Sequence, residues 1–379
     1  MKNTIKKLVF PVFIAIFMLS CNEDDSLPST YSPEETITSP ENIDIQGLYV
    51  LNEGNMGSNK ASLDYFDYST GVFSNNIYSK VNSTVTYSLG DVGNDIQIYG
   101  SKMYAVINVS NYIEVMDAKT AKHLGEIQIP NCRYIAFDKG YAYVTSYAGP
   151  VSIDPNAPPG YVVKVDTATL QIVNKEVVGY QPDELVVANN KLYVANSGGY
   201  RVPNYDNTVS VIDLNTFKEI KKIEVAINLW RIRKDKNNKL WVTSRGDYGK
   251  NPPRTFILNP DTDTVEKEVN AVVSDMSFFD DKMYYYGYAW TAQGATTHYG
   301  IIDINDQEVV SDQFIKNGIE KDIVIPYAIT VNPVNGDIFI ADATNYVTSG
   351  RLHCFDKDGY FKWKATTGDI PGHFTFLWK

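Results

Sequence analysis

The sequence predicts an all-β protein: a seven-bladed β-propeller of four-stranded antiparallel blades whose ring is closed by the C-terminal strand. Three observations predict this fold. One strand pattern recurs seven times, a second strand ending in Asp or Asn follows each copy, and long amphipathic runs of helical period are few. A unit repeated at a fixed spacing is typical of repeat architectures, and four strands per repeat are typical of a propeller blade.

The first recurring strand is centred on an aromatic residue. Its copies include GLYVLN, KLYVAN and DIFIAD, and their mean spacing is about 48 residues, within the range of blade repeats. Short apolar runs of this kind, rich in β-branched and aromatic residues, indicate buried strands. The aligned aromatic positions are Tyr49, Tyr104, Tyr143, Tyr193, Trp241, Tyr284 and Phe339.

The second recurring strand ends in an Asx residue, as in TVSVID. An Asp or Asn side chain at this point accepts a hydrogen bond from the backbone two residues further on and closes a tight turn. A fourth strand follows each turn, and an innermost strand precedes each aromatic strand. The positions are Asp67, Asp117, Asp166, Asp213, Asn259, Asp303 and Asp356.

The two ends of the propeller are expected to share a blade. The first unit lacks an innermost strand, and the C-terminal GHFTFLWK has the pattern to supply it. Pairing the two would leave no unpaired strand edge. The rival interpretation, two separate β-sandwiches, does not predict one pattern shared by seven units.

The N-terminal residues predict a targeting segment. Lysines precede an apolar run from Leu8 to Leu19 that is shorter than the roughly 20 residues needed to span a bilayer. Residues 1–20 are therefore expected to be a signal peptide. Ser20 before Cys21 resembles the lipobox of bacterial lipoproteins, which implies that Cys21 is acylated. An ordinary signal peptide with an incidental cysteine is the alternative.

The segment after Cys21 is expected to be a tether. Residues 21–44 are rich in Ser, Thr, Pro and Glu, which favours a flexible linker, and residues 45–379 form the predicted propeller. The acidic run at residues 23–25 resembles the export tag of Bacteroides-type surface lipoproteins; alternatively, it only solvates the tether.

Charge and cysteine content exclude two classes of protein. The net charge of -11, with no broad basic surface, argues against a nucleic-acid partner. Cys132 and Cys354 fall in distant predicted blades, so we expect two buried free thiols rather than a disulfide scaffold.

The order of strands places the long loops on one face. With strands named A to D from the axis outward, the A–B and C–D turns lie on one face and the B–C and D–A loops on the other. Six of the seven B–C segments are long, and only NVSN in the second unit is short. Long loops in compact domains are usually functional. This loop-rich face is therefore the candidate binding surface.

The loop-rich face is predicted to combine aromatic rings, amides and arginines, a composition typical of binding surfaces. The alternative is that many of these residues only pack the loops against one another. The B–C candidates are Asn55, Asn108, Tyr147, Asn196, Tyr200, Arg201, Tyr205, Arg245, Tyr248, Trp290, Asn345 and Tyr346. The D–A candidates are Asn94, Tyr180, Trp230 and Tyr327.

Few residues indicate catalysis. The sequence has neither the H-E-x-x-H spacing of a zinc site nor a nucleophile elbow, and of its histidines only His298 falls near the loop-rich face. Four loop carboxylates could meet over the axis and hold a cation, but solvated loop carboxylates are the simpler interpretation. These are Asp154, Asp206, Asp247 and Asp342. We therefore expect no catalytic residue, no metal site and no catalytic cofactor.

The repeated pattern over residues 45–379 resembles the YncE-like propellers. The opening GLYVLNEGNMGSNKASLDYFDYSTG is similar to the surface-lipoprotein branch that includes the cobalamin-capturing BtuG-type lipoproteins of Bacteroides-type bacteria. This resemblance implies a lipid-anchored outer-membrane protein, facing the extracellular side, that binds cobalamin or a related corrinoid and passes it to a TonB-dependent transporter.

A corrinoid has a broad apolar ring, a periphery of neutral amides and one phosphate, which suits a wide cup of Asn and Tyr side chains. Arg201 or Arg245 could meet the phosphate. Two alternatives stay open: a propeller enzyme of the lyase or lactonase type, and a protein-interaction platform in a glycan or peptide uptake complex.

Overall fold

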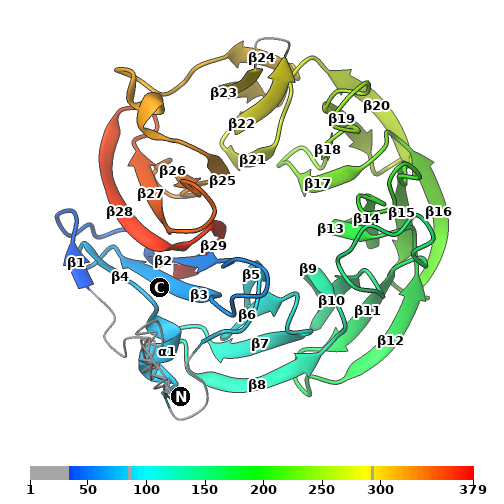
Figure 1. The fold of residues 1–379 in the computed structure, drawn as a ribbon, viewed down its shortest axis with the longest axis horizontal. Helices are drawn as coiled ribbons and strands as arrows, with labels where there is room; N and C mark the ends of the chain where they lie inside the picture. Colours follow the sequence, from blue (N-terminus) through cyan, green and yellow to red (C-terminus); the bar gives the residue numbers. More distant parts are fainter. Residues whose placement is uncertain (1–33, 84–87, 292–293) are drawn as a thin grey trace, which may run out of the picture.

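The computed structural model describes residues 34–83, 88–291 and 294–379, and it forms a ring of seven antiparallel sheets (Figure 1). In every sheet the strands run in the order A, B, C, D from the axis outward, which confirms the predicted seven-bladed propeller. The predicted signal peptide and Cys21 lie outside the described residues. Blades are numbered 1 to 7 in the order of their B strands.

The inner strands carry the repeat pattern. The A strands of blades 1 to 7 are β29 (Pro371–Trp378), β5 (Gly93–Tyr99), β9 (Cys132–Asp138), β13 (Pro182–Ala188), β17 (Leu229–Lys234), β21 (Asp275–Phe279) and β25 (Pro326–Val331). The B strands are β2 (Ile45–Asn52), β6 (Lys102–Ile107), β10 (Tyr141–Ser146), β14 (Lys191–Asn196), β18 (Leu240–Ser244), β22 (Lys282–Thr291) and β26 (Ile338–Asp342).

The outer strands complete each blade. The C strands are β3 (Ser62–Asp67), β7 (Tyr112–Asp117), β11 (Tyr161–Asp166), β15 (Thr208–Asp213), β19 (Arg254–Asn259), β23 (Gly294–Asp303) and β27 (Ser349–Phe355). The D strands are β4 (Val72–Ser74), β8 (His123–Gln128), β12 (Ile172–Val177), β16 (Lys218–Glu224), β20 (Thr264–Val269), β24 (Glu308–Ser311) and β28 (Phe361–Asp369). One short α-helix, α1 (Ile77–Val81), and a 3-10 turn, η1 (Ile319–Asp322), lie in connecting segments.

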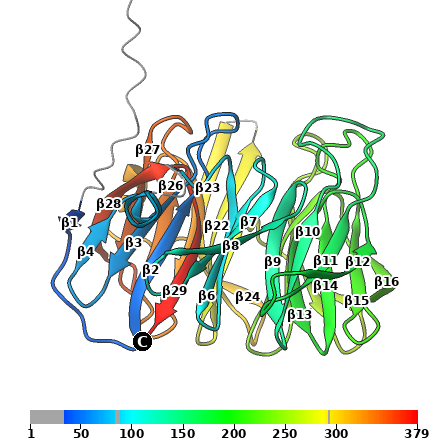
Figure 2. The same ribbon diagram turned by 90° about the horizontal axis from the view of Figure 1, so that it is seen from below.

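The last strand closes the ring. β29 pairs antiparallel with β2 along its length, from Ile45 opposite Trp378 to Asn52 opposite Pro371. It therefore supplies the innermost strand of blade 1, as the sequence predicts. Figure 2 shows the C terminus on the face opposite the long loops.

The structure differs from the expected linker over its last residues. Glu34–Thr36 form β1, which pairs with β4 and adds a fifth strand to blade 1. The chain then passes so close to Gly71 that a Cβ there would lie 2.0 Å from the carbonyl oxygen of Thr38. Backbone pairing of this kind needs no apolar side chains, so a polar composition alone does not reveal it.

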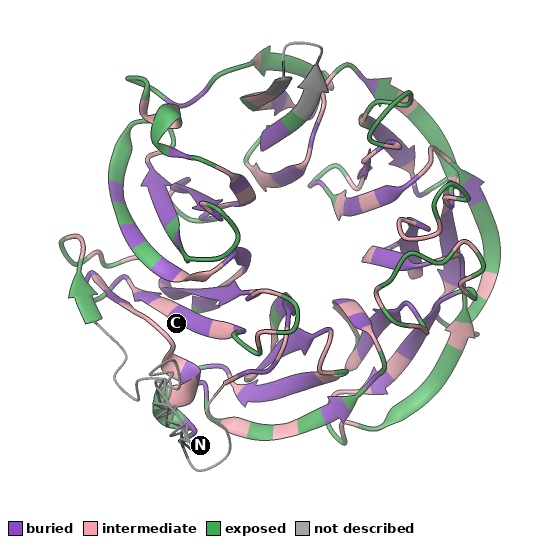
Figure 3. Ribbon diagram, viewed as in Figure 1, coloured by how far each residue is buried: buried purple, intermediate pink, exposed green. Residues whose placement is uncertain are grey.

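The recurring aromatic residues join neighbouring blades. None of the seven is more than 2% exposed. Tyr49 packs with Met103 and Met116 of blade 2, and Trp241 packs with Met283 of blade 6. Figure 3 shows the consequence: burial is concentrated in the inner strands, whereas the D strands form a largely exposed outer rim. The repeat exists because each blade buries the same faces against the next.

The predicted Asx turns are present in all seven blades. Each Asp or Asn accepts a hydrogen bond from the backbone N–H two residues further on. Asp213 also accepts the N–H of Thr216, and these hydrogen bonds hold the pKa of its carboxyl below the ordinary value. Cys132 and Cys354 are buried free thiols, as expected, and burial raises the pKa of Cys132 to about 12.

His353 of β27 gives the fold a dependence on pH. It is fully buried, and neither ring nitrogen has a hydrogen-bond partner among the described residues. Burial lowers the pKa of His353 to about 4. The unfolded chain therefore takes up a proton near pH 6.5 while the folded protein does not, so stability is full above pH 6.5 and declines as the pH falls toward 4.

We predict that this histidine lowers the free energy of unfolding by about 2 kcal/mol between pH 7.5 and pH 5.0. Urea denaturation of the protein and of His353→Phe at both pH values tests this, and the variant should lose that part of the pH dependence. His298→Gln, at an exposed position of β23, is the control and should keep it. Equal pH dependence in the protein and His353→Phe would contradict the prediction.

Candidate functional site

Two cavities lie one above the other near the axis. The mouth cavity, of about 330 Å³, opens on the loop-rich face and is lined by B–C loops and the first residues of the A strands. The inner cavity, of about 180 Å³, is lined by the next residues of the A strands. Arg231 lines both cavities. The elaborated face therefore leads to a polar interior.

Irregular strand pairing aims the A-strand side chains at the axis. Six of the seven A–B pairs shift register where the A strand begins, for example between Pro182 and Leu185. Such a bulge bends the strand and redirects a side chain. By register, the equivalent positions of blades 1 to 7 are His373, Asp95, Tyr134, Glu184, Arg231, Asp275 and Ala328.

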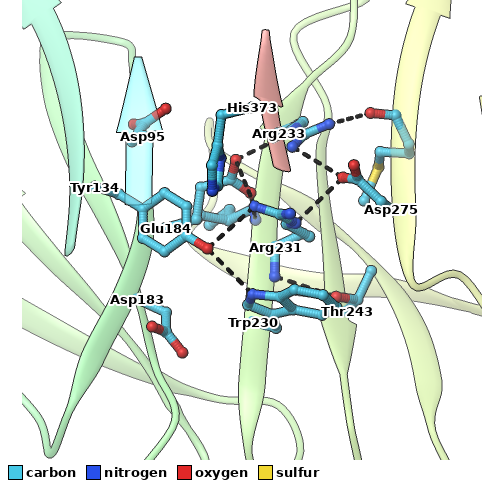
Figure 4. A network of polar contacts seen from close by, with 12 residues as sticks. Asp95, Tyr134, Asp183, Glu184, Trp230, Arg231, Arg233, Thr243, Asp275 and His373 are labelled. Carbon is cyan, nitrogen blue, oxygen red and sulfur yellow. Dashed lines mark hydrogen bonds and ion pairs between the residues drawn. The ribbon is translucent and has the colours of Figure 1, made fainter. Parts of the chain in front are cut away.

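Arg231 is the centre of a buried network (Figure 4). It is 3% exposed; its Nε lies 3.2 Å from Oδ1 of Asp275, and its Nη1 donates to the hydroxyl of Tyr134 at 3.2 Å. Arg233 donates to Glu184 at 3.0 Å and pairs with the same oxygen of Asp275 at 2.9 Å. Burial opposes the charge of Arg231, but its anionic and phenolic neighbours, Asp275 first, hold its pKa above the ordinary value.

The carboxylates of this network also join neighbouring blades. Glu184 accepts the backbone N–H of Ile232 at 2.9 Å, and Asp275 accepts that of Ile329 at 3.1 Å. Asp95 does the same for Ile135 of blade 3 at 3.0 Å. Each carboxylate thus satisfies an N–H in the A strand of another blade. The carboxylates of the inner cavity are therefore already engaged in hydrogen bonds that join the blades.

One side of the mouth cavity carries an acidic group. Glu53, at the start of the B–C loop of blade 1, accepts a hydrogen bond from the hydroxyl of Tyr327 at 2.8 Å. Its other oxygen lies 3.1 Å from Nε2 of His373. Both oxygens of this carboxylate are therefore engaged by residues of blades 7 and 1.

The other side of the mouth cavity is basic. Arg133 of blade 3 and Arg245 of blade 5 both line it, and both contact Asp183 of blade 4, at 3.2 and 3.3 Å. Asp183 is fully buried and also accepts a hydrogen bond from Tyr147 at 2.7 Å. Trp230 lies beside them, with the guanidinium carbon of Arg245 4.3 Å from its ring centroid.

Seven of the sixteen candidates predicted from the sequence line the mouth cavity. They are Asn55, Asn94, Asn108, Tyr200, Trp230, Arg245 and Tyr327. Asn94 and Asn108 also hold the start of β9, because their amides donate to the backbone carbonyls of Arg133 and Cys132 at 2.6 and 2.8 Å.

Two further candidates are buried and do not line the cavity. Tyr147 is 2% exposed, and its hydroxyl donates a hydrogen bond to Asp183. Asn196 is fully buried, and its amide donates to the hydroxyls of Thr208 and Ser210 within blade 4. Neither side chain lines the mouth cavity, because each is used to hold the scaffold.

The remaining candidates do not line the cavity. Arg201 stacks over the ring of Tyr180 at 3.5 Å, and Tyr346 packs edge-on against Tyr327. Tyr205, Tyr248 and Asn345 belong to the B–C loops around the mouth. Trp290 is the penultimate residue of β22, and its side chain is outside the described residues.

The four loop carboxylates organise the loops themselves. Asp206 and Asp342, expected to be solvated, are buried: Asp206 accepts the N–H of Tyr180 at 2.7 Å, and Asp342 accepts that of Ile325 at 2.9 Å. Asp154 and Asp247 accept N–H groups of their own loops. Within the described ranges, no three His, Cys, Asp or Glu side chains form a group that could hold a metal ion.

The polar mouth residues that sequence reasoning missed are Glu53, Arg133, Tyr134 and Arg231, together with the buried Asp183 that contacts Arg133. A signal for Arg231 exists in the aligned A strands. Charged residues recur there at one position, as Asp95, Glu184, Arg231 and Asp275, although an innermost strand between blades would otherwise favour apolar residues.

Known proteins share the fold but not the sequence. Hydrazine synthase of Kuenenia stuttgartiensis superposes with a TM-score of 0.59 at 15% identity, covering 74% of this chain and 88% of that one. A quinonprotein alcohol dehydrogenase-like protein of Bacteroides thetaiotaomicron gives a TM-score of 0.61 at 12% identity, covering 87% and 78%. At such identities the likeness is one of fold alone.

Comparison with protein families is more specific. No curated protein matches the chain. A family described as a domain of unknown function (DUF5074) matches residues 46–359, from the first B strand to the turn before the last D strand. Since this match covers most of the propeller, the chain belongs to the DUF5074 family.

Proposed function

We propose that this protein binds a small ligand in the mouth cavity without transforming it, and that the ligand is cobalamin or a related corrinoid. The observation that carries the proposal is the mouth cavity itself, where aromatic rings, amides and arginines from six blades converge on the loop-rich face. Concave sites that combine flat apolar surface with a few fixed polar groups are the usual form of ligand sites.

The lining suits a ligand with an apolar ring and a polar periphery. Trp230, Tyr200 and Tyr327 offer flat surfaces. Asn108 is 1% exposed, its nitrogen donates to Cys132, and its side-chain oxygen has no partner among the described residues. That oxygen is itself buried, so accepting a donor group of the ligand, such as a peripheral amide of a corrinoid, would require the surrounding loops to move.

The volume of the mouth cavity fits insertion of only part of a corrinoid. At about 330 Å³ the mouth cavity is at the lower end of ligand pockets, so a corrinoid would place only part of its periphery inside it. The ring would then lie against the surrounding loops, where Met56, Tyr248 and Tyr346 present exposed side chains. Contacts from several blades would share the binding energy.

Binding is favoured over catalysis because the carboxylates of the cavities are engaged by other residues of the fold. A lyase or lactonase needs an available acid–base pair or an activated water. Here Arg231 pairs with Asp275, and Glu53 contacts Tyr327 and His373.

The proposal includes a location and a partner. Acylation of Cys21 would anchor the protein at the extracellular side of the outer membrane, and a TonB-dependent transporter would receive the ligand. The lipobox-like sequence and the YncE-like strand pattern support both points. Tethering a binding site near a transporter raises the local concentration of ligand. Among the described residues, no helix has the length and apolar character to cross a membrane.

Isothermal titration of the purified protein with cyanocobalamin tests the proposal. We expect saturable binding, and Trp230→Ala should weaken it about thirtyfold, because removing a central aromatic anchor commonly costs about 2 kcal/mol. Trp378→Ala is the matched control, since this exposed tryptophan ends β29 on the opposite face. Absence of binding by the folded protein would overturn the corrinoid assignment.

A further inference from the structure

The basic side of the mouth cavity holds two arginines for one carboxylate. Arg133 and Arg245 come from different blades, and both reach Asp183, which lies beneath the cavity wall. Within the part of the chain that the structure describes, the three groups together leave one positive charge without a counterion. Arg231 does not add to this excess, because its partners are Asp275 and Glu184.

Most of the hydrogen-bonding capacity of the two arginines is unused. A guanidinium has five N–H donors. Arg133 donates to a described residue only through Nε, and the side chain of Arg245 only through Nη2, in both cases to Asp183. Both side chains are partly accessible, at 14% and 21%. Their remaining N–H groups are therefore available at the cavity.

The two guanidinium groups are held in place before any ligand arrives. Arg133 lies over the ring of Tyr147, 4.7 Å from its centroid, and Arg245 lies over Trp230 at 4.3 Å. Asp183 accepts from both arginines and from Tyr147 at once. Fixed donors lose little conformational entropy on binding, which favours recognition.

The charge at the mouth is polarised across the cavity. The positive excess lies on blades 3 to 5, whereas Glu53 lies on blade 1 and is engaged by Tyr327 and His373. The protein as a whole carries a net charge of -11, so an anion would meet a local positive site within a negative molecule. An oxyanion that presents two oxygens, such as a phosphate or a carboxylate, matches the fork of guanidinium donors.

From this geometry we infer that Arg133 and Arg245 form an oxyanion subsite in the mouth cavity, and that the ligand carries a phosphate or carboxylate group bound there. The inference rests on the proposed function and specifies one chemical group of the ligand. In a corrinoid that group is the phosphodiester of the nucleotide loop. Arg201, the other arginine suggested by the sequence, stacks on Tyr180 outside the cavity lining.

A pair of related probes tests the subsite. Cyanocobalamin has the phosphodiester, and dicyanocobinamide lacks it. We expect the protein to bind cyanocobalamin at least tenfold more tightly. Arg133→Gln and Arg245→Gln should each weaken binding of cyanocobalamin at least tenfold and of dicyanocobinamide less than twofold. Arg254→Gln is the matched control, because this exposed arginine of blade 5 pairs with Glu268 on the outer strands.

A second measurement separates this inference from the corrinoid assignment. Melting temperatures are compared in sodium phosphate, sodium acetate and sodium chloride of equal ionic strength. We expect phosphate or acetate to raise the melting temperature of the protein more than chloride does, and the effect to be lost in Arg133→Gln and Arg245→Gln. A response to phosphate alone identifies a phosphate site, and a response to both anions includes carboxylates.

The outcomes are distinguishable. If neither corrinoid binds but the anion effect depends on the two arginines, the corrinoid assignment fails and the subsite stands. The oxyanion subsite is wrong if cyanocobalamin binds and the glutamine variants weaken the binding of both corrinoids equally. It is also wrong if the variants weaken the binding of neither. Arg133→Lys and Arg245→Lys keep the charge that balances Asp183, so they replace any glutamine variant that does not fold and should retain part of the anion effect.

Discussion

Deleting residues 371–379 is expected to abolish folding of the propeller. This segment is β29, the innermost strand of blade 1, and its removal leaves β2 without a partner on the axis side. Leu377 is buried in the cluster between blades 1 and 2, and Phe374 and Phe376 pack against the cluster between blades 7 and 1. Because the two phenylalanines are only partly buried, these three side chains together contribute roughly 4 kcal/mol, a large fraction of the stability of a typical protein.

The exposed edge adds to this loss. β2 has the sequence IQGLYVLN and is almost entirely buried, so without β29 it becomes a long apolar edge strand of the kind that templates aggregation. We therefore expect the truncated chain to be insoluble, or to show no cooperative melting by circular dichroism.

A matched truncation at the other end provides the control. Removing residues 1–36 deletes β1, the exposed outer strand of the same sheet, whose three residues pair with β4 and whose Glu34 forms an exposed ion pair with Lys80. This variant should stay soluble and melt within a few degrees of the full chain. Similar behaviour of the two truncations would mean that β29 does not close the ring.

The closure of the ring and the blade pattern were predictable because every blade packs against its neighbours in the same way. The aromatic position of the B strand bridges to the next blade, as Trp241 does to Met283, and the Asx position closes the C–D turn. Both constraints recur at fixed spacing, so seven copies reinforce one interpretation. The fifth strand β1 has no counterpart in other blades, and it was missed.

The candidate site was predicted only in part because its residues depend on contacts between blades. Tyr147 looks like an exposed loop aromatic, yet Asp183, 36 residues further along the chain, binds its hydroxyl inside the fold. Arg231 meets Tyr134 from 97 residues away. Neither contact produces a recognisable pattern in the nearby sequence. A strand bulge also changes which side chains face the axis. The sequence therefore indicated the face on which the mouth cavity opens, but not the charged A-strand residues that line it.

Asp183→Asn is expected to have the largest effect of any single substitution in the cavities. Asp183 is fully buried and is the common partner of Arg133, Arg245 and Tyr147. Removing one member of a buried ion pair typically costs about 3–5 kcal/mol, because the remaining charge stays desolvated without compensation. Here two arginines would lose the only carboxylate that they contact among the described residues. Urea denaturation at pH 7.5 measures the change in the free energy of unfolding.

A double-mutant cycle with Arg245→Gln isolates the interaction. The two substitutions should be less than additive, since each removes the same contact. Arg254→Gln, whose partner Glu268 is exposed, should change stability by less than about 1 kcal/mol. A cost of that small size for Asp183→Asn would show that water, rather than Asp183, balances the two arginines.

Asp183→Asn should lower the stability of the protein and strengthen its binding of anions. Without the carboxylate, the local excess of positive charge rises from one to two, so the phosphate-dependent gain in melting temperature should increase in Asp183→Asn even though the variant melts lower than the protein in chloride. A site that only holds the blades together would lose stability and gain no anion response. Because an anion replaces the missing counterion, phosphate should also restore part of the lost stability, by the linkage between binding and folding. Restoration by phosphate that disappears when Arg133→Gln is added would trace both effects to the pair of arginines.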